Sequence, residues 1–357
     1  MTELADLPIR DDLRGLSPYG APQIDVPIQL NVNENNFGIP AEVAADIVAA
    51  VAEVVSGVNR YPDREFTALR EALAAFLGDG VTAEQIWAAN GSNEVIQQFL
   101  QAFGGPGRSL LGFTPSYSMY PLYARGTHTT WRTASRDADF TLRPEAAAAA
   151  VREARPDVVV LARPNNPTGT ALGLDVIEAV YEATDGMVLV DEAYQEFSEL
   201  PSAVGLLPGR PRLAVSRTMS KAFAFAGVRL GYLVADPAVG DALRLVRLPY
   251  HLSALTQAAA TAALGHASEM LANVDAIKRQ RDRIIAELPG LGYSPWPSES
   301  NFVLFGGVAD PQRTFRTLIE RGIIIRDVGI PHTLRVTAGT AEETTAFLAA
   351  LAETPNN

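Results

Sequence analysis

"SRTMSKAFAFAGVRLGY", residues 216–232, contains Lys221, one of only two lysines in the chain. Arginine keeps its proton at ordinary pH and cannot act as a nucleophilic amine, whereas a lysine in apolar surroundings can. The second lysine, Lys278, lies in "AIKRQRDRIIAE", a charged helical face on which a solvated side chain is expected. Lys221 stands among Ala, Phe and Gly residues, so two interpretations are open. Either its stem packs while its amine reaches solvent, or the amine takes part in chemistry.

Composition excludes several classes of function. The chain has 357 residues, 47% of them hydrophobic, and a formal net charge of −12 with no basic stripe, so nucleic acid and anionic membranes are poor partners. It has no cysteine, which excludes disulfides, thiolate zinc sites and iron–sulfur clusters, and its four histidines are scattered without ligand spacing. The acidic N-terminus lacks an apolar signal core. We therefore expect a cytoplasmic protein with no metal, no nucleic-acid partner and no membrane partner.

Most of the chain alternates helical and strand patterns. Residues 1–38 form an irregular arm, which we expect to join a small domain at the other end of the chain. Residues 40–55 and 64–77 have helical periodicity. The predicted strands are "IWAAN", "SLLGF", "DVVVLAR", "MVLVDEAY", "RLAVSR" and "LGYLVA", most of them short and apolar, as parallel strands buried on both faces are. This alternation predicts a three-layer α/β/α large domain with a mostly parallel sheet over residues 39–245.

The pattern changes after about residue 245. Alanine-rich helices are predicted at 254–264 and 269–288, followed by the strand "NFVLFGG", a helix at 311–320 and the strands "GIIIRD" and "TLRVTAG". This order indicates a smaller α+β domain over residues 246–357.

Polar residues follow four of the predicted strands, and the carboxyl ends of parallel strands are where active residues gather. Ser92 and Asn93 open a helix after "IWAAN", which suits a phosphate, although an ordinary N-cap would look the same. The turn "PNNPTG" presents two amides after "DVVVLAR", or is simply a turn. Asp191 ends a buried strand, where a carboxylate is costly without a cationic or hydrogen-bonding partner. Thr218 and Lys221 follow the fourth strand.

Together these strand ends describe one kind of site, with a phosphate cup, a buried acid, amide and phenol donors, and one unpaired amine. The chain contains no GxGxxG after its first strand, no GxxxxGK[ST] and no GxSxG, so nucleotide-binding and hydrolase interpretations lack their motifs. Pyridoxal 5'-phosphate (PLP) uses every part of the set, including a lysine.

The motifs resemble those of the fold-type I, PLP-dependent aminotransferases, and more narrowly of the histidinol-phosphate aminotransferases. The resemblance runs nearly end to end, through "YGAP", "LNVNEN", "NRYPD", "WAANGSNE", "PSYSMY", "PNNPTG", "VDEAY", "SRTMSKAFAFAGVRLGY", "VRLPYHLS", "SESNFV", "IIIRD" and "LRVTAGT". Three motifs that follow one another along the chain are highly specific for the fold. They are "NNPTG", "DEAY" and "SKAF", the last followed by a spaced G-R-G. Asn36 stands where the family commonly has a proline.

The resemblance implies a role for each matching residue. Lys221 is similar to the lysine that holds PLP covalently and later moves the proton, and Asp191 to the acid that keeps the pyridine nitrogen protonated. Asn166 and the catalytic Tyr194 are the implied contacts of the ring oxygen, and Tyr117 is the implied contact of the ring face. The implied phosphate contacts are Ser92, Asn93, Thr218, Ser220 and Arg229. Tyr61 is implied to reach the phosphate from the second subunit of a homodimer. The implied substrate-binding residues are Tyr19, Asn33, Tyr250, Arg326 and Arg335, with Tyr250 donated by the partner subunit.

The implied reaction is transamination of L-histidinol phosphate with 2-oxoglutarate, giving imidazole acetol phosphate and glutamate. One pocket must then accept a phosphate and a dicarboxylate, which Arg335 and Arg326 could both bind through charge-assisted hydrogen bonds. Arg326 could instead form a surface ion pair with Asp327.

Three other functions compete with this one. An aromatic amino-acid aminotransferase would share the scaffold, and so would a PLP-dependent decarboxylase of a phosphorylated amino acid such as threonine phosphate. A non-catalytic PLP-sensing regulator is the third. The chain has neither an appended helix-turn-helix segment nor a basic patch to support the regulator.

Overall fold

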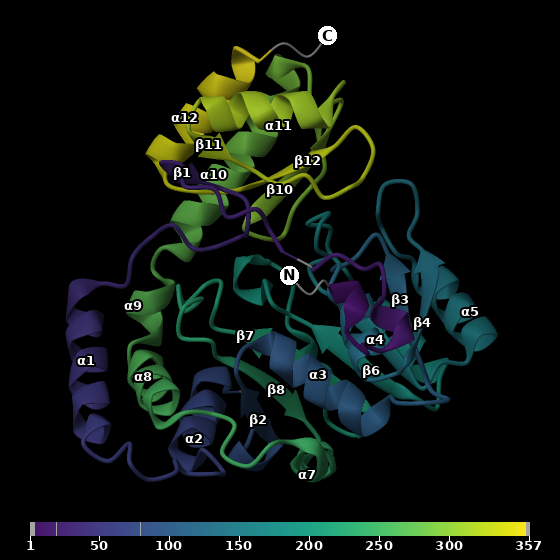
Figure 1. Cartoon of the computed structure of the whole chain (residues 1–357), viewed down its shortest axis with the longest axis vertical. Coiled ribbons are helices and arrows are strands. Elements are labelled where there is room, and N and C mark those ends of the chain that lie inside the picture. The colour runs from purple at the N-terminus through teal and green to yellow at the C-terminus, as the bar shows by residue number, and fades with distance from the viewer. Residues whose placement is uncertain (1–3, 19, 79, 355–357) are drawn as a thin grey trace.

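The structure, a computed structural model, describes residues 4–18, 20–78 and 80–354. Its larger sheet has seven strands in the order β2-β8-β7-β6-β5-β3-β4 (Figure 1), and only β8 runs antiparallel to its neighbours. The strands are β2 (Ile86–Ala89), β3 (Ser109–Thr114), β4 (Thr130–Ser135), β5 (Val158–Ala162), β6 (Met187–Asp191), β7 (Leu213–Thr218) and β8 (Gly231–Ala235). The predicted α/β class with a mostly parallel sheet is confirmed.

Helices pack around this sheet. They are α1 (Ala41–Val55), α2 (Thr67–Leu77), α3 (Ser92–Phe103), α4 (Tyr120–Gly126), α5 (Pro144–Ala154), α6 (Leu174–Glu182), α7 (Pro237–Val246) and α8 (Ala254–Gly265). Helix α3 packs on β2, β7 and β8, and α5 packs against α6. Helices α1, α2 and α8 lie side by side at the β2 edge (Figure 1). The boundary at residues 245/246 stays a prediction.

The sequence analysis did not predict one strand of the larger sheet. Strand β4 is the edge strand and pairs only with β3. Its sequence "TWRTAS" is mostly polar and partly exposed, unlike the buried run "VVVLA" of β5. A solvated edge strand lacks the continuous apolar run that marks a parallel strand buried on both faces, so its sequence gave no strand signal.

The C-terminal part has its own small sheet. Strands β9 (Ser294–Pro295), β10 (Phe302–Gly306) and β12 (Leu334–Thr337) pair antiparallel, and α10 (Val274–Glu287), α11 (Pro311–Glu320) and α12 (Ala341–Ala352) accompany them (Figure 1). The N-terminal arm contributes β1 (Ile28–Gln29), which pairs in parallel with β11 (Ile323–Ile324). The arm therefore lies beside the C-terminal part, although the two are far apart in sequence.

The predicted helix 269–288 is two helices in the structure. Helix α9 (Ala267–Leu271) ends before α10 begins, and Asn273 is the N-cap residue of α10. Asn273 makes no side-chain cap hydrogen bond, although asparagine is among the weaker residues for a helix interior. Within the part of the chain that the structure describes, no helix has both the length and the apolar character needed to cross a bilayer.

Candidate active site

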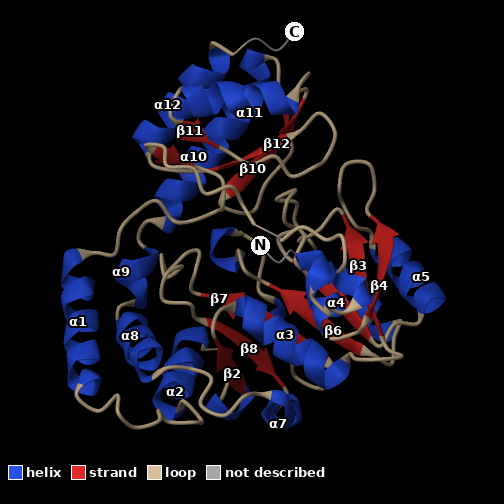
Figure 2. Ribbon diagram, viewed as in Figure 1, coloured by secondary structure: helices blue, strands red, loops and turns tan. Residues whose placement is uncertain are grey.

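A cavity of about 490 Å³ lies at the carboxyl ends of β5, β6 and β7. Loops fill the region between the larger and the smaller sheet (Figure 2), and several of them line this cavity. The predicted residues that line it are Asn33, Ser92, Asn93, Tyr117, Asn166, Asp191, Tyr194, Thr218, Ser220, Lys221, Arg229, Arg326 and Arg335. A volume of this size suits a small-molecule ligand.

Three predicted residues are not among these lining residues. Tyr19 lies outside the described residues. Tyr61 and Tyr250 stack on each other with ring centroids 4.4 Å apart, away from the cavity, and the Tyr61 side chain is 79% exposed. Within one chain, the structure therefore does not bring these two phenols to the site.

Lys221 follows β7 and its amine points into the cavity region. The Nζ atom donates a hydrogen bond to the Val32 carbonyl oxygen at 3.0 Å and lies 5.9 Å from the centroid of the Tyr194 ring. Burial and the positive charges of Arg335 and Arg229 lower the pKa of the Lys221 amine to about 8, against the opposing charge of Glu34. A lysine with this pKa is partly neutral near physiological pH, which a nucleophilic amine requires.

Asp191 ends β6 and is buried at the floor of the cavity. Its Oδ2 atom accepts a hydrogen bond from the Tyr120 hydroxyl at 2.8 Å, and its Oδ1 atom accepts one from the Ser216 hydroxyl at 3.2 Å. Burial raises the pKa of the Asp191 carboxyl, while the bonds from Tyr120 and Ser216 oppose that rise. The carboxylate thus has the partners that its buried position requires.

Tyr120 and Ser216 are site residues that the sequence analysis missed. The signal for Tyr120 was present in "PSYSMY", where it stands three residues after Tyr117. The two rings meet edge to face with centroids 5.5 Å apart, and both residues line the cavity, where the Tyr120 hydroxyl reaches Asp191. Ser216 precedes Thr218 by two residues, and alternation along a strand places both side chains on the same face as Asp191.

The N-terminus of α3 forms one wall of the cavity. The N-cap residue of α3 is Gly91, with φ 84°. Ser92 is therefore not an ordinary N-cap, the alternative interpretation of this helix start. A Cβ atom on Gly91 would lie 2.8 Å from Arg229 Nη2, and one on Gly231 would lie 2.1 Å from the Ser92 backbone nitrogen. The two glycines therefore allow the Arg229 guanidinium and β8 to approach this helix end closely.

Hydroxyl groups complete that wall. Thr218 Oγ1 lies 3.0 Å from Ser220 Oγ and accepts a hydrogen bond from the Ser220 backbone N–H at 3.1 Å. Together with the positive end of α3 and Arg229, these donors form a set that suits a phosphate group.

Amide, phenol and guanidinium groups meet on the opposite side. The Tyr194 hydroxyl accepts hydrogen bonds from Asn33 Nδ2 at 2.9 Å and from Asn166 Nδ2 at 3.3 Å. Arg335 Nη1 donates to Asn166 Oδ1 at 2.7 Å, and its Nη2 atom donates to the Asn31 carbonyl oxygen at 2.8 Å. The predicted ring-oxygen donors and the predicted substrate arginine are thus one connected cluster.

Arg326 and Asp327 form no ion pair with each other in the described structure, so the surface-pair interpretation of Arg326 is not supported. Asp327 instead accepts hydrogen bonds from Gln312 Nε2 at 2.6 Å and from the Gly329 backbone N–H at 2.8 Å. The ionisable residues lining the cavity are the cations Lys221, Arg229, Arg326 and Arg335 and the carboxylates Asp191 and Asp327. Positive groups outnumber negative ones, which favours ligands that carry two negative charges.

Asn36, which stands where a proline is common, makes a contact that proline cannot make. Its Nδ2 atom donates to both carboxylate oxygens of Glu343, at 2.9 and 2.8 Å. Glu343 is the capping-box partner of Thr340 at the start of α12. Asn36 thus ties the arm to the C-terminal part next to the cavity.

Comparisons with known proteins identify the family. The family described as "Aminotransferase class I and II" matches residues 25–351. The chain is 62% identical to a histidinol-phosphate aminotransferase of Paenarthrobacter aurescens, covering 98% of this chain and 96% of the relative. It is 56% identical to a histidinol-phosphate aminotransferase of Thermobifida fusca, covering 97% and 95%.

A solved structure agrees with these relatives. The crystal structure of a histidinol-phosphate aminotransferase from Sinorhizobium meliloti in complex with pyridoxal-5'-phosphate superposes with a TM-score of 0.83 at 25% identity, covering 92% of this chain and 91% of that one. The chain belongs to the class I and II aminotransferase family.

Proposed function

We propose that this protein catalyses the PLP-dependent transamination of L-histidinol phosphate with 2-oxoglutarate, giving imidazole acetol phosphate and glutamate in histidine biosynthesis. The observation that carries the proposal is the Lys221 amine, with its pKa lowered to about 8, in one cavity with the buried Asp191 carboxylate and a phosphate-type donor set. Relatives with at least 56% identity over nearly their full length are named for this activity.

The residues of the cavity fit PLP by the chemistry of their donors. Ser92, Thr218, Ser220 and Arg229 would hold the phosphate at the start of α3, where Gly91 leaves room for the guanidinium. Asn166 and Tyr194 would hold the ring oxygen, and Tyr117 would pack on the ring face. Once bound, PLP supplies an electron sink that stabilises the negative charge left when a substrate proton is removed.

Lys221 moves that proton in the proposed mechanism. Its amine would first hold the cofactor, and after the substrate amine displaces it, the neutral amine would act as general base and then as general acid. A pKa near the working pH is what allows one group to accept and return a proton.

Asp191 sets the charge at the opposite end of the cofactor. Its carboxylate would keep the pyridine nitrogen protonated, which the electron sink requires. The Tyr120 and Ser216 hydroxyls hold both carboxylate oxygens by donating hydrogen bonds. These bonds favour the ionised carboxylate, the form that pairs with a protonated nitrogen.

The two arginines from the C-terminal part explain how one cavity accepts two substrates. Histidinol phosphate carries a phosphate and no α-carboxylate, whereas glutamate carries two carboxylates and no phosphate. Arg335 donates hydrogen bonds to Asn166 and to the Asn31 carbonyl oxygen. Arg326 lines the cavity, and the neighbouring Asp327 carboxylate bonds to Gln312. Planar guanidinium groups bind phosphate and carboxylate with similar bidentate geometry.

A kinetic panel tests this function against its competitors. The PLP-loaded protein is assayed with histidinol phosphate, phenylalanine, tyrosine and threonine phosphate, each with 2-oxoglutarate, while glutamate and carbon dioxide are measured. The proposal predicts the highest kcat/KM for histidinol phosphate. A higher value for phenylalanine or tyrosine would identify an aromatic aminotransferase, carbon dioxide release a decarboxylase, and binding without turnover a regulator.

We further propose that the active unit is a homodimer with shared sites, to which Tyr61 and Tyr250 contribute from the partner subunit. Tyr61 is too exposed for a packing role, and it stacks on Tyr250, which follows the exposed Leu245 (87%) and Leu248 (75%) in the chain. A second copy would cover such exposed apolar residues. A two-fold axis would make the contribution reciprocal. The cytoplasmic location stays a prediction.

Complementation tests the shared site. Lys221→Ala and Tyr61→Ala are prepared separately, shown to be impaired, and refolded together. A mixed dimer would carry both lesions in one site and none in the other, so random pairing should restore about a quarter of the sites. No recovery, with mixed dimers confirmed by mass, would place Tyr61 in the site of its own chain.

A further inference from the structure

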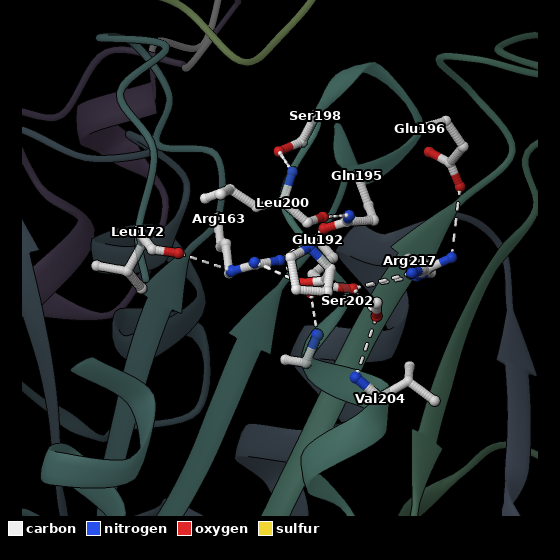
Figure 3. A network of polar contacts seen from close by, with 12 residues as sticks. Arg163, Leu172, Glu192, Gln195, Glu196, Ser198, Leu200, Ser202, Val204 and Arg217 are labelled. Atoms are coloured by element: carbon white, nitrogen blue, oxygen red, sulfur yellow. Dashed lines mark hydrogen bonds and ion pairs between the residues drawn. The ribbon is translucent and has the colours of Figure 1, made fainter. Parts of the chain in front are cut away.

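A buried ion-pair network lies behind the strand ends that carry the cavity residues. Figure 3 shows Glu192 between two arginines, Arg163 and Arg217. The side chains of Glu192 and Arg163 are 0% and 1% exposed. None of the three side chains lines the cavity. The proposed mechanism therefore gives them no role.

Glu192 has an unusually complete set of donors for a buried carboxylate. Its Oε1 atom accepts hydrogen bonds from Arg163 Nη1 at 2.8 Å and the Ala203 backbone N–H at 2.7 Å. Its Oε2 atom accepts from the Ser202 hydroxyl at 2.7 Å and from Arg217 Nε and Nη2 at 3.2 and 3.1 Å. A buried carboxylate with donors on both oxygens is held in one geometry.

The arginines extend the network to the neighbouring loops. Arg163 donates to the carbonyl oxygens of Leu172 at 2.9 Å and Pro201 at 2.6 Å, and to Gln195 Oε1 at 2.6 Å. Arg217 Nη1 lies 3.7 Å from Glu196 Oε1. The network thus joins the ends of β5, β6 and β7 to the segment containing the short helices η4 (Gln195–Phe197) and η5 (Ala203–Leu206) (Figure 3).

Alternation along the strands explains why this network lies behind the cavity. Each of its three charged residues stands next to a residue that lines the cavity, because successive side chains of a strand point to opposite faces. Glu192 follows Asp191, Arg217 precedes Thr218, and Arg163 precedes Pro164. The backbone bonds from Arg163 N to the Asp191 carbonyl and from Glu192 N to the Ser216 carbonyl, both 2.8 Å, hold the same three strand ends in register.

We propose that Glu192, clamped by Arg163 and Arg217, is a positioning residue that fixes the backbone carrying Asp191 and the turn leading into Lys221. The inference rests on the proposed PLP-dependent function and adds a group that touches neither cofactor nor substrate. Two buried guanidinium groups that share one carboxylate hold three adjacent strand ends at fixed separations. These separations also set the distances between the catalytic residues on the opposite face of the strands.

The test replaces Glu192 by glutamine, which keeps the shape of the side chain and removes its charge. We expect kcat to fall by roughly 10- to 100-fold, the range associated with a small displacement of reacting groups. KM for 2-oxoglutarate should change by less than about twofold, because Arg335 lies on β12 and outside the network. Without any turnover, the dissociation constant of PLP should rise and the visible circular dichroism of the bound cofactor should weaken.

Two control variants separate positioning from general effects. Glu178→Gln removes a carboxylate of α6 that pairs with Arg210, and neither residue lines the cavity. Val151→Ala lowers stability through a buried position of α5 and leaves the network intact. We expect both controls to keep the wild-type PLP affinity and circular dichroism. A Glu192→Gln protein with a lower melting temperature but wild-type PLP affinity, spectrum and kcat would overturn the proposal.

A milder variant covers the case in which Glu192→Gln does not fold. Ser202→Ala removes the hydrogen bond to Glu192 Oε2 and the bond that Ser202 Oγ accepts from the Val204 backbone N–H at 3.0 Å, and it leaves both ion pairs. Ser202→Ala should raise the dissociation constant of PLP and lower kcat, each by a few-fold. Wild-type values of both constants would overturn the proposal. Wild-type protein that binds no PLP would instead refute the proposed function, so the two failures are distinguishable.

Discussion

The two lysines of the chain lie in opposite surroundings. Lys221 is half-buried at the cavity, donates to the Val32 carbonyl oxygen at 3.0 Å and has two arginines nearby, which together with burial lower the pKa of its amine to about 8. Lys278, on α10, forms an ion pair with the exposed carboxylate of Glu199, and its own side chain is 18% exposed. One environment disfavours the charged amine, and the other provides a partner for it.

This difference shows that the fold, more than the residue type, decides which lysine can react. Desolvation and like charges favour the neutral, nucleophilic amine of Lys221, whereas Lys278 has a carboxylate partner and no place in the cavity. The same contrast applies to acids and arginines, because α10 carries a residue of each kind outside the cavity that can serve as a matched control. Each of the first three predictions below therefore pairs a cavity variant with a variant on α10.

Replacing the two lysines should produce the largest contrast. Lys221→Ala should abolish transamination, because no other group of the cavity can hold the cofactor covalently and return the proton. Lys278→Ala should retain nearly full activity, since it removes only a surface pair. Steady-state assays with histidinol phosphate measure both. An inactive Lys278→Ala protein would reverse the assignment.

Replacing the buried acid should have the next largest effect. Asp191→Asn should bind PLP but lose about 100-fold or more in kcat, the size typical for removing one preorganised electrostatic partner. Asp282→Asn changes an exposed acid of α10 that pairs with Arg281, and should leave kcat unchanged. Normal turnover of Asp191→Asn in single-turnover and steady-state assays would contradict its electrostatic role.

Replacing the anchored arginine should affect the two acids more than the cofactor. Arg335→Leu should lower kcat/KM for glutamate and 2-oxoglutarate roughly ten- to hundredfold, because it removes charge-assisted bonds to a carboxylate. Arg283→Leu, which removes bonds to Glu287 and Thr345 on the surface, should change neither value. Unchanged kinetics for Arg335→Leu would mean that Arg335 has only a structural role.

The smallest effect concerns the pH dependence of Lys221. Only the neutral amine attacks PLP, so the rate at which the cofactor-free protein incorporates PLP should rise as pH increases through about 8. An ordinary lysine would show this rise near pH 10.4 instead. Stopped-flow absorbance, with a simple primary amine as the reference reaction, measures the midpoint. A midpoint close to that of the reference amine would contradict the lowered pKa.

The sequence predicted the parts of the molecule that follow simple local rules. Buried apolar runs predicted β5, β6 and β7, and the polar residues at their ends predicted Asp191 and Lys221 at the same sheet edge. Strand β4 was not predicted because it is a solvated edge strand, and the break before α10 was not predicted because the helical pattern continues across it.

The contacts behind the site could not be predicted for a different reason. The bond from Tyr120 to Asp191 joins residues 71 positions apart, and the pairing of Arg163 with Glu192 needs two strands in a known register. Neither residue type nor spacing indicates such a pair before the sheet order is known.

Reductive trapping tests the central claim most directly. The protein is incubated with PLP, reduced with borohydride, digested and examined by mass spectrometry for the modified lysine. We predict that the cofactor is found on the peptide containing Lys221, that Lys278 stays unmodified, and that histidinol phosphate added before reduction prevents the labelling. Cofactor on Lys278, or on neither lysine, would contradict the account.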